Sequence, residues 1–400
     1  MRSACCVALS VCGFLGTVPR EAAAGPVEYV VHVSVDGLRS DVITSLGAAN
    51  LPYFYRMRAE GAFTDNARTD YDITVTLPNH VTQLTSRAVY GPAGHNWTSN
   101  DDPPFGVTLH TNKGSYVAGV CDVAHDNGPR TGLYASKSKF SLFDVSWNAT
   151  SGAPDTTGPD NGRDKVDVYV YNGNTATLTN RLVTDMKANP FRYAFLHLTD
   201  PDTIGHSSGW NPAPGTPYAN VIRQMDARLG LIFSMIEGDA RLNGRTAIIL
   251  TSDHGGYGTG HSDYWRREVY TIPFYVWGPG VTPGADLYDL NAGRRLDPGT
   301  ERPPYSAPLQ PIRNGEAGNL ALGLLGLGPI PGSTINAAQD LIVPEPAGLL
   351  LGLLGLPVWP TRRFRRRCPS PSLAPPSHTS ISYSPSRSGY RPCSRTSWTT

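Results

Sequence analysis

The chain has 400 residues, enough for one large domain or for two or three of ordinary size. Only 17% of its residues are charged, and 42 Gly and 35 Pro predict many turns, which excludes a coiled coil or a simple helical bundle. The formal charge of +1 is unevenly spread, because the part before residue 361 holds 26 basic and 33 acidic residues. An acidic body without a basic stripe argues against nucleic-acid binding, which depends on clustered Lys and Arg.

Residues 1–25 have the layout of a cleaved signal peptide. Arg2 precedes an apolar run from Ala4 to Leu15, and small residues follow from Ala22 to Gly25. The run is too short to span a bilayer. The sequence therefore predicts an exported protein.

Three short apolar runs predict buried strands, and each ends near an acidic residue. They are Tyr29–Val35 before Asp36, Tyr193–Leu198 before Asp200, and Thr246–Leu250 before Asp253. Helical periodicity between them, as in 220–237, predicts a three-layer α/β/α fold around a largely parallel sheet over residues 27–342. We expect the Gly-, Pro- and Asn-rich segment 90–173 to be a loop-rich cap insertion, and 319–327 to be the last helix.

Asp and His side chains gather at the predicted strand ends, where ligands bind in such sheets. Asp202 and His206 are four residues apart, which puts both on one side of a helical turn. Asp253 and His254 precede two glycines, and His261 follows seven residues after His254. A single strand-end Asp is more often a turn residue or a helix cap. Together, carboxylates and imidazoles in this arrangement predict a zinc site.

The segment 74–80 places a hydroxyl just before a proline turn. Thr76 or Asn79 could simply cap a helix that continues through Leu84. A helix N-terminus also favours a phosphate anion, so capping and catalysis are compatible.

These segments resemble the alkaline phosphatase superfamily, specifically its nucleotide pyrophosphatase/phosphodiesterase branch. The resemblance extends from about Tyr29 to Leu341 and depends on four motifs in the right order: 35–39, 76–80, 201–206 and 252–255. It implies two zinc ions. The ligands implied for one ion are Asp36, Thr76, Asp253 and His254, and those for the other are Asp202, His206 and a late histidine.

The late histidine departs from the pattern of the phosphodiesterases, in which it lies far downstream. His261 is the only body histidine after His254, and other branches of the superfamily keep this residue close to the Asp-His pair. We therefore expect His261 to complete the second site.

The resemblance also implies a mechanism on a small phosphate ester. Thr76 would attack phosphorus and form a covalent phosphothreonine, while Asn79 would donate its amide to a phosphate oxygen. A sulfatase is disfavoured, because its nucleophile segment has a Cys or Ser followed by Pro and Arg. The alternatives are a phosphomonoesterase of the same superfamily and a non-catalytic binding protein of the envelope.

We expect diesters to be preferred over monoesters, because few cations lie near the motifs to meet a further charged oxygen. The basic residues near the motifs, none of them an expected ligand, are Arg39, Arg87, Arg266 and Arg267. Those that could supply the missing cation are Lys137 and Lys139. The aromatic residues that could stack on a leaving group are Tyr71, Trp97, Tyr257 and Trp265.

The end of the chain resembles the PEP-CTERM sorting signal of bacteria. Residues 343–346 read Val-Pro-Glu-Pro, a Leu/Gly-rich run follows over 347–356, and five Arg lie between 362 and 367. The resemblance implies cleavage of the segment 343–367 by an exosortase, after transient membrane contact, since the run is shorter than the ~20 residues of a span. Residues 368–400 are predicted to be a disordered tail. We expect the protein in the periplasm, outer envelope or extracellular matrix of a bacterium.

Overall fold

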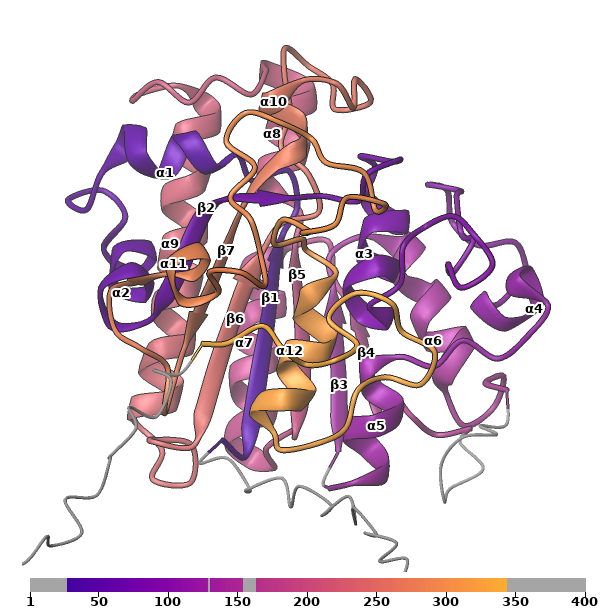
Figure 1. Ribbon diagram of the computed structural model, residues 1–400. Helices are drawn as coiled ribbons and strands as arrows, with labels where there is room; N and C mark the ends of the chain where they lie inside the picture. Colours follow the sequence, from indigo (N-terminus) through magenta and orange to yellow (C-terminus); the bar gives the residue numbers. More distant parts are fainter. Residues whose placement is uncertain (1–26, 129, 154–162, 344–400) are drawn as a thin grey trace, which may run out of the picture. The chain divides into compact units, whose positions relative to one another are not determined.

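Eight strands form the central sheet of the computed structural model, which describes residues 27–128, 130–153 and 163–343 (Figure 1). The strands are β1 (Tyr29–Val35), β2 (Ala62–Arg68), β3 (Thr131–Ala135), β4 (Val168–Tyr171), β5 (Tyr193–Leu198), β6 (Thr246–Thr251), β7 (Thr271–Trp277) and β8 (Ala285–Asp286). Their order is β4-β3-β5-β1-β6-β7-β2-β8. Neighbours from β4 to β6 are parallel, whereas β7 is antiparallel to β6 and β2. The predicted α/β fold with a largely parallel sheet is confirmed.

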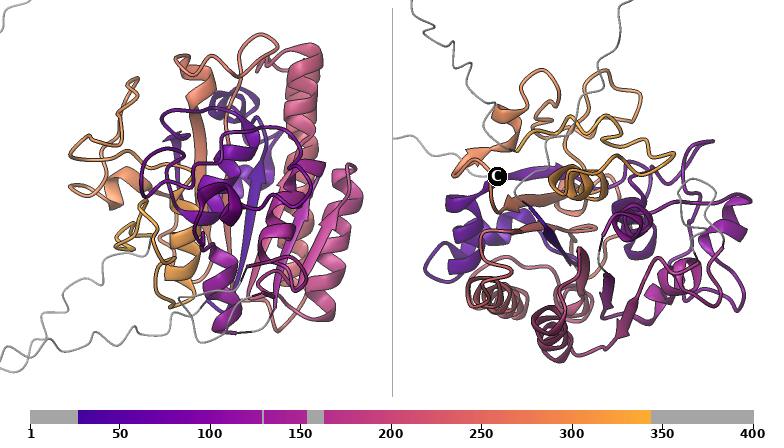
Figure 2. Two further views of the ribbon diagram at one scale, coloured as in Figure 1. Left: turned by 90° about the vertical axis from the view of Figure 1, so that its right-hand side faces the viewer. Right: turned by 90° about the horizontal axis from the view of Figure 1, so that it is seen from below.

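Helices cover both faces of the sheet (Figure 2). The helices that pack on one face are α1 (Ser40–Leu46), α2 (Pro52–Glu60), α7 (Thr175–Ala188) and α9 (Pro217–Glu237). Those on the other face are α3 (Thr76–Thr85), α4 (Leu109–Lys113), α5 (Val120–Asp126), α6 (Ser141–Trp147) and α12 (Glu316–Leu324). The remaining helices are η1 (Ser138–Phe140), α8 (Asp200–Ser208), α10 (Arg267–Tyr270) and α11 (Leu287–Leu290).

Strand β1 shows how the sequence divides its side chains between the two faces. Val31, Val33 and Val35 belong to the core under α9, because alternate residues of a strand point the same way. The intervening His32 and Ser34 point towards the α3 face, where both are buried and hydrogen-bonded. Two polar side chains in a central strand therefore lie on the face that also carries α3.

The three predicted strands match β1, β5 and β6, and the predicted helices 220–237 and 319–327 match α9 and α12. The expectation that 90–173 is only loop and cap is wrong, since it contains α4, α5, α6 and two strands of the sheet, β3 and β4. Strand β3 lacks a strong apolar run because Gly132 gives room to the rings of Tyr134 and Phe191.

The described residues contain no helix long and apolar enough to cross a membrane. The predicted signal peptide, the sorting segment beyond Val343 and the predicted tail lie outside the described residues.

Candidate active site

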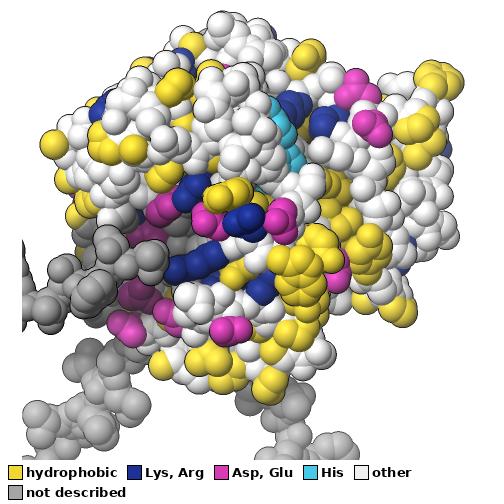
Figure 3. All heavy atoms as spheres, turned by 90° about the horizontal axis from the view of Figure 1, so that it is seen from above, with side chains coloured by type: hydrophobic (Ala, Val, Ile, Leu, Met, Phe, Trp, Pro, Cys, Tyr) yellow, Lys and Arg dark blue, Asp and Glu magenta, His cyan; other side chains and the backbone are white. Residues whose placement is uncertain are grey.

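The carboxyl ends of β1, β5 and β6 bring the predicted site residues to one edge of the sheet. Asp36 follows β1, α8 follows β5, and Asp253 lies two residues after β6. Gly37 permits this approach, because its φ is +72° and a Cβ there would lie 3.1 Å from the Cα of Asp202. Figure 3 looks onto this edge and shows histidine surface in a hollow, with Lys and Arg side chains beside it.

Asp36, Asp253 and His254 form the first cluster, and all three are fully buried. The Nε2 atom of His254 lies 3.5 Å from Asp36 Oδ1 and 3.1 Å from Asp253 Oδ2. The hydroxyl of Thr76 lies 3.4 Å from the same nitrogen. Thr76 is the first residue of α3 and makes no capping hydrogen bond, because the N-cap position is Val75. The structure therefore places the hydroxyl at the cluster instead of at a cap.

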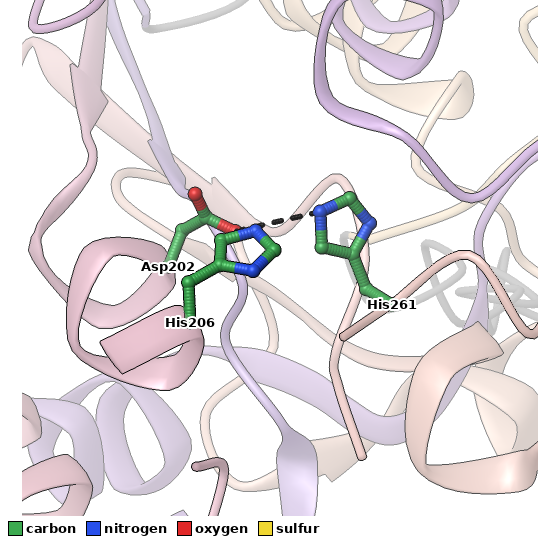
Figure 4. Close-up of side chains that lie close together, drawn as sticks. All are labelled: Asp202, His206 and His261. Carbon is green, nitrogen blue, oxygen red and sulfur yellow. Dashed lines mark ion pairs between the residues drawn. The ribbon is translucent and has the colours of Figure 1, made fainter. Parts of the chain in front are cut away.

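Asp202, His206 and His261 form the second cluster (Figure 4). Asp202 and His206 come from adjacent turns of α8, with His206 Nε2 3.4 Å from Asp202 Oδ1. His261 comes from the loop after β6, and its Nε2 atom lies 3.7 Å from the same oxygen. The structure thus brings His261 to the second cluster, as the shorter motif spacing predicts.

The three site histidines are oriented in the same way. The Nδ1 atom of each lies 2.8–2.9 Å from a backbone carbonyl oxygen: Gly255 for His254, Thr74 for His261 and Thr259 for His206. Because a carbonyl only accepts, Nδ1 carries the hydrogen and Nε2 presents a lone pair to its cluster. Burial lowers the pKa of His254 to about 4 and that of His261 to about 3, which keeps both rings neutral at neutral pH.

Each site carboxylate has one oxygen bound to protein donors. Asp36 Oδ2 lies 2.9 Å from His197 Nε2, and Asp253 Oδ1 accepts from the backbone N–H groups of Gly37 and His254. The other oxygens, Asp36 Oδ1, Asp202 Oδ1 and Asp253 Oδ2, are buried and have no hydrogen-bond partner among the described residues. They are the oxygens that face the histidine lone pairs.

Acceptor atoms that face one another across 3.1–3.7 Å repel unless a cation lies between them. Burial, and after it the nearby charge of Asp36, raises the pKa of Asp253 well above its usual value. Tetrahedral ligands at ~2.0–2.1 Å from zinc are themselves about 3.3 Å apart. The two clusters therefore fit two divalent metal ions bound by carboxylate and imidazole.

Lys137, in the turn after β3, lies between the two clusters. Its Nζ atom is 2.7 Å from Asp36 Oδ2, 2.7 Å from Asp202 Oδ2 and 3.4 Å from Thr76 Oγ1. Burial opposes the charge of Lys137, but its ion pairs with Asp36 and Asp202 raise its pKa overall. Of the two lysines considered from the sequence, Lys139 instead donates to the carbonyl of Asn100.

His197 is a site residue that the sequence analysis missed. It lies within β5, where its ring nitrogens contact Asp36 Oδ2 at 2.9 Å and Ser136 Oγ at 2.9 Å. Burial lowers its pKa, so the ring is neutral and donates from Nε2 to the carboxylate. The only sequence signal for His197 is a polar residue within an apolar strand.

Asn79 does not lie where the expected mechanism needs it. The side chain is fully buried, and its Nδ2 donates to the carbonyls of Ile73 and Val75 at 2.7 and 3.1 Å. Its Oδ1 accepts from the backbone N–H of Asp70 and from Asn314 Nδ2. Asn79 therefore holds the segment that leads into Thr76, and its amide hydrogens are not directed at a phosphate oxygen.

Three of the four arginines named from the sequence have partners away from the two clusters. Arg39 binds Asp41 and the carbonyls of Trp210 and Gly256. Arg87 donates to the carbonyls of Ala93 and Pro331. Arg266 lies over the ring of Tyr257.

Two of the proposed stacking residues are also occupied or enclosed. Trp97 is buried, and Tyr71 lies under Arg302. Trp265 is 64% exposed and remains accessible. Tyr257 is 47% exposed, but Arg266 covers one side of its ring.

Comparison with known proteins gives the same family. The model of the family described as type I phosphodiesterase/nucleotide pyrophosphatase matches residues 30–267. Among curated proteins, GPI ethanolamine phosphate transferase 1 of Emericella nidulans is 36% identical over 94 residues, which are 22% of this chain and 9% of that protein. Arylsulfatase K of Xenopus laevis is 32% identical over 74 residues, or 18% and 14% of the two chains. The matches span only about a tenth of these relatives.

Solved structures agree on the fold. Human ectonucleotide pyrophosphatase/phosphodiesterase 5 has a TM-score of 0.53 and 16% identity, covering 78% of this chain and 99% of that one. An inactive murine form of the same protein, solved with AMP, has a TM-score of 0.51 and 17% identity, covering 78% and 99%.

Proposed function

The chain belongs to the type I phosphodiesterase/nucleotide pyrophosphatase family, and we propose that it hydrolyses phosphoric diesters through a covalent phosphothreonine at Thr76. One observation carries the proposal: the Thr76 hydroxyl, at the N-terminus of α3, lies 3.4 Å from a histidine nitrogen of the first cluster. A phosphate there would also meet the positive end of the helix dipole.

The chain's own residues would perform the binding and positioning. Asp36, Asp253 and His254 would hold one divalent ion, and Asp202, His206 and His261 the other. Two such ions supply the charge that activates a hydroxyl and stabilises a leaving oxygen. Zinc is the ion proposed, because three of the ligands are imidazoles.

The reaction would proceed in two displacements at phosphorus. In the first, Thr76 Oγ1 loses its proton and bonds to phosphorus while the bond to one alcohol breaks; that alcohol takes up a proton, and the phosphorus on Thr76 keeps its other ester group. In the second, water attacks phosphorus, the bond to Thr76 Oγ1 breaks, one proton of the water returns to Thr76, and a phosphomonoester is released. The backbone carbonyls that accept hydrogen bonds from the three Nδ1–H groups keep each imidazole in one tautomer during both steps.

The diester class follows from charge and from the accessible aromatic residues. A diester has one charge fewer than a monoester dianion, and the ammonium of Lys137 is already paired with two carboxylates. Trp265, and the part of the Tyr257 ring that Arg266 leaves exposed, could contact a leaving group. Because the murine relative was solved with AMP, diesters containing AMP are suitable first substrates.

Phosphomonoester hydrolysis is the second candidate, and Lys137 is the observation that favours it. Its Nζ atom lies 3.4 Å from Thr76 Oγ1, within reach of a phosphoryl oxygen bound at that hydroxyl.

The test compares kcat/KM on p-nitrophenyl phosphate and on bis-p-nitrophenyl phosphate. We expect the diester to be the better substrate for the wild type and for Lys139→Ala. A monoester preference that Lys137→Ala abolishes would establish the second candidate instead. Mass spectrometry of enzyme acid-quenched during turnover of bis-p-nitrophenyl phosphate should find a p-nitrophenyl phosphoryl group on the peptide that contains Thr76. The absence of this adduct from every residue of a turning-over enzyme would contradict the covalent route.

We also propose that the protein is exported to the periplasm, outer envelope or extracellular matrix of a bacterium and processed by an exosortase-type enzyme. The support is the pattern of residues 1–25 and 343–367. Fractionation with detection of the mature N-terminus tests this, and a full-length chain in the cytoplasm would contradict it.

A further inference from the structure

Lys137 connects the two clusters through one carboxylate of each. Its Nζ atom pairs at 2.7 Å with Asp36 Oδ2 of the first cluster and at 2.7 Å with Asp202 Oδ2 of the second. No other Lys or Arg in the described part of the chain forms an ion pair with a carboxylate of either cluster. A single ammonium therefore serves both sites.

The carboxylates around it are almost completely enclosed. The side chains of Asp36 and Asp253 are 0% exposed and that of Asp202 is 5% exposed. Burying an ionised carboxylate is costly unless a cation or several donors compensate it. Two of the three carboxylates pair with this one ammonium, so its charge offsets part of the cost of burying them.

Lys137 binds the oxygens that the metal ions would not use. It contacts Oδ2 of Asp36 and of Asp202, whereas Oδ1 of each faces the histidine nitrogens. The ammonium can therefore stay in place when both metal sites are filled. A divalent ion entering either site would then meet a fixed positive charge on the far side of its own ligand.

Removal of the charge would leave the ligands oriented. Asp36 keeps its hydrogen bond from His197 at 2.9 Å, and Asp202 is held within α8 beside His206. The main effect of neutralising Lys137 on the two sites would therefore be electrostatic.

We propose that Lys137 is an internal counter-ion shared by the two metal sites, which stabilises the fold before metal binds and weakens the affinity for each divalent ion. This inference rests on the metal sites of the proposed function. It concerns metal binding and folding, so its test does not use hydrolysis.

The experiment measures zinc affinity by competition with a chromophoric chelator, and thermal unfolding with and without zinc, for the full chain. Lys137→Met keeps the length of the side chain and removes the charge. We expect it to bind zinc about tenfold more tightly than the wild type, and to unfold at a lower temperature when zinc has been removed by a chelator. A variant that folds only in the presence of zinc would support the same conclusion.

Two further variants isolate the cause. Lys139→Met removes a charge from the same turn. Because Lys139 contacts the backbone carbonyl of Asn100, the zinc affinity of this variant should match that of the wild type. Lys137→Arg keeps the charge, so it should bind zinc more weakly than Lys137→Met and about as weakly as the wild type.

Zinc affinity of Lys137→Met within threefold of the wild type, or weaker, would overturn the inference. So would unchanged unfolding of the zinc-free variant. A wild type that binds no zinc would instead refute the metal sites of the proposed function, so the two failures are distinguishable.

Discussion

Replacement of Asn79 by alanine separates a structural role from a role in binding phosphate. The side chain makes four hydrogen bonds, to the backbone of Asp70, Ile73 and Val75 and to the amide of Asn314, and it is 0% exposed. A donor to phosphate would instead be free of the protein on its catalytic side. The structural role predicts a large loss of stability on replacement, whereas a role only in binding phosphate predicts little change.

The magnitude follows from the number of bonds lost. Each hydrogen bond contributes about 1 kcal/mol, and partners left buried without a replacement raise the cost, so Asn79→Ala should lower the free energy of unfolding by about 4 kcal/mol. Over roughly 300 ordered residues this corresponds to a fall of about 6 °C in Tm. Asn314→Ala, which removes one of the four bonds, should cost about 1–2 kcal/mol.

The assay is denaturant unfolding of the purified variants, with Asn180→Ala as control. Asn180 is exposed on α7, so its replacement should change stability by less than about 0.5 kcal/mol. If Asn79→Ala unfolds like the wild type but loses its turnover, the amide acts on the substrate and the structural reasoning is refuted.

Three further predictions concern the nucleophile, the metals and pH. Thr76→Ala should lower kcat at least a hundredfold with little change in unfolding, and Thr76→Ser should keep partial activity; a loss of about 1 kcal/mol of stability with activity retained would identify a cap only. Chelation should abolish hydrolysis and zinc should restore it better than magnesium, because three ligands are imidazoles; full recovery with magnesium alone would contradict this. Burial raises the pKa of Asp226 to about 6, although the backbone N–H groups of Tyr53 and Phe54 oppose the shift. Since the folded state then holds the proton more tightly than the unfolded state, about 2–3 kcal/mol of the free energy of unfolding should be lost as pH rises from 4 to 6. Urea titrations at the two pH values measure this loss, and Asp226→Asn should remove it.

The sequence predicts two kinds of site residue. Some lie close together in the chain, and others follow the ends of neighbouring parallel strands. Asp202 and His206 are four residues apart on α8, and Asp36 and Asp253 follow parallel strands that pair directly with each other. Helix periodicity and the common direction of parallel strands are sufficient to bring such residues together. His261 follows the same rule, because the loop that carries it begins at the end of β6.

Asn79 could not be assigned in this way, because its partner Asn314 lies 235 residues further along the chain. An amide beside a proline turn has the same sequence pattern whether it faces substrate or a distant side chain. The two possibilities are distinguished only by the packing of the segment before α12, which carries Asn314, against α3.

Lys137 shows a second limit, which concerns the order of strands. The residue reaches Asp36 only because β3 pairs with β5 and β5 pairs with β1, so that the turn after β3 lies at the same edge as the end of β1. Gly132 weakens the apolar pattern of β3, and the Gly-, Pro- and Asn-rich composition of 90–173 predicts a loop in its place. When the sequence does not predict a strand, it also does not predict where the charged residue after that strand lies. The position of Lys137 beside both clusters is thus a consequence of sheet topology, and the response of zinc affinity to its charge tests whether that topology sets the electrostatics of the site.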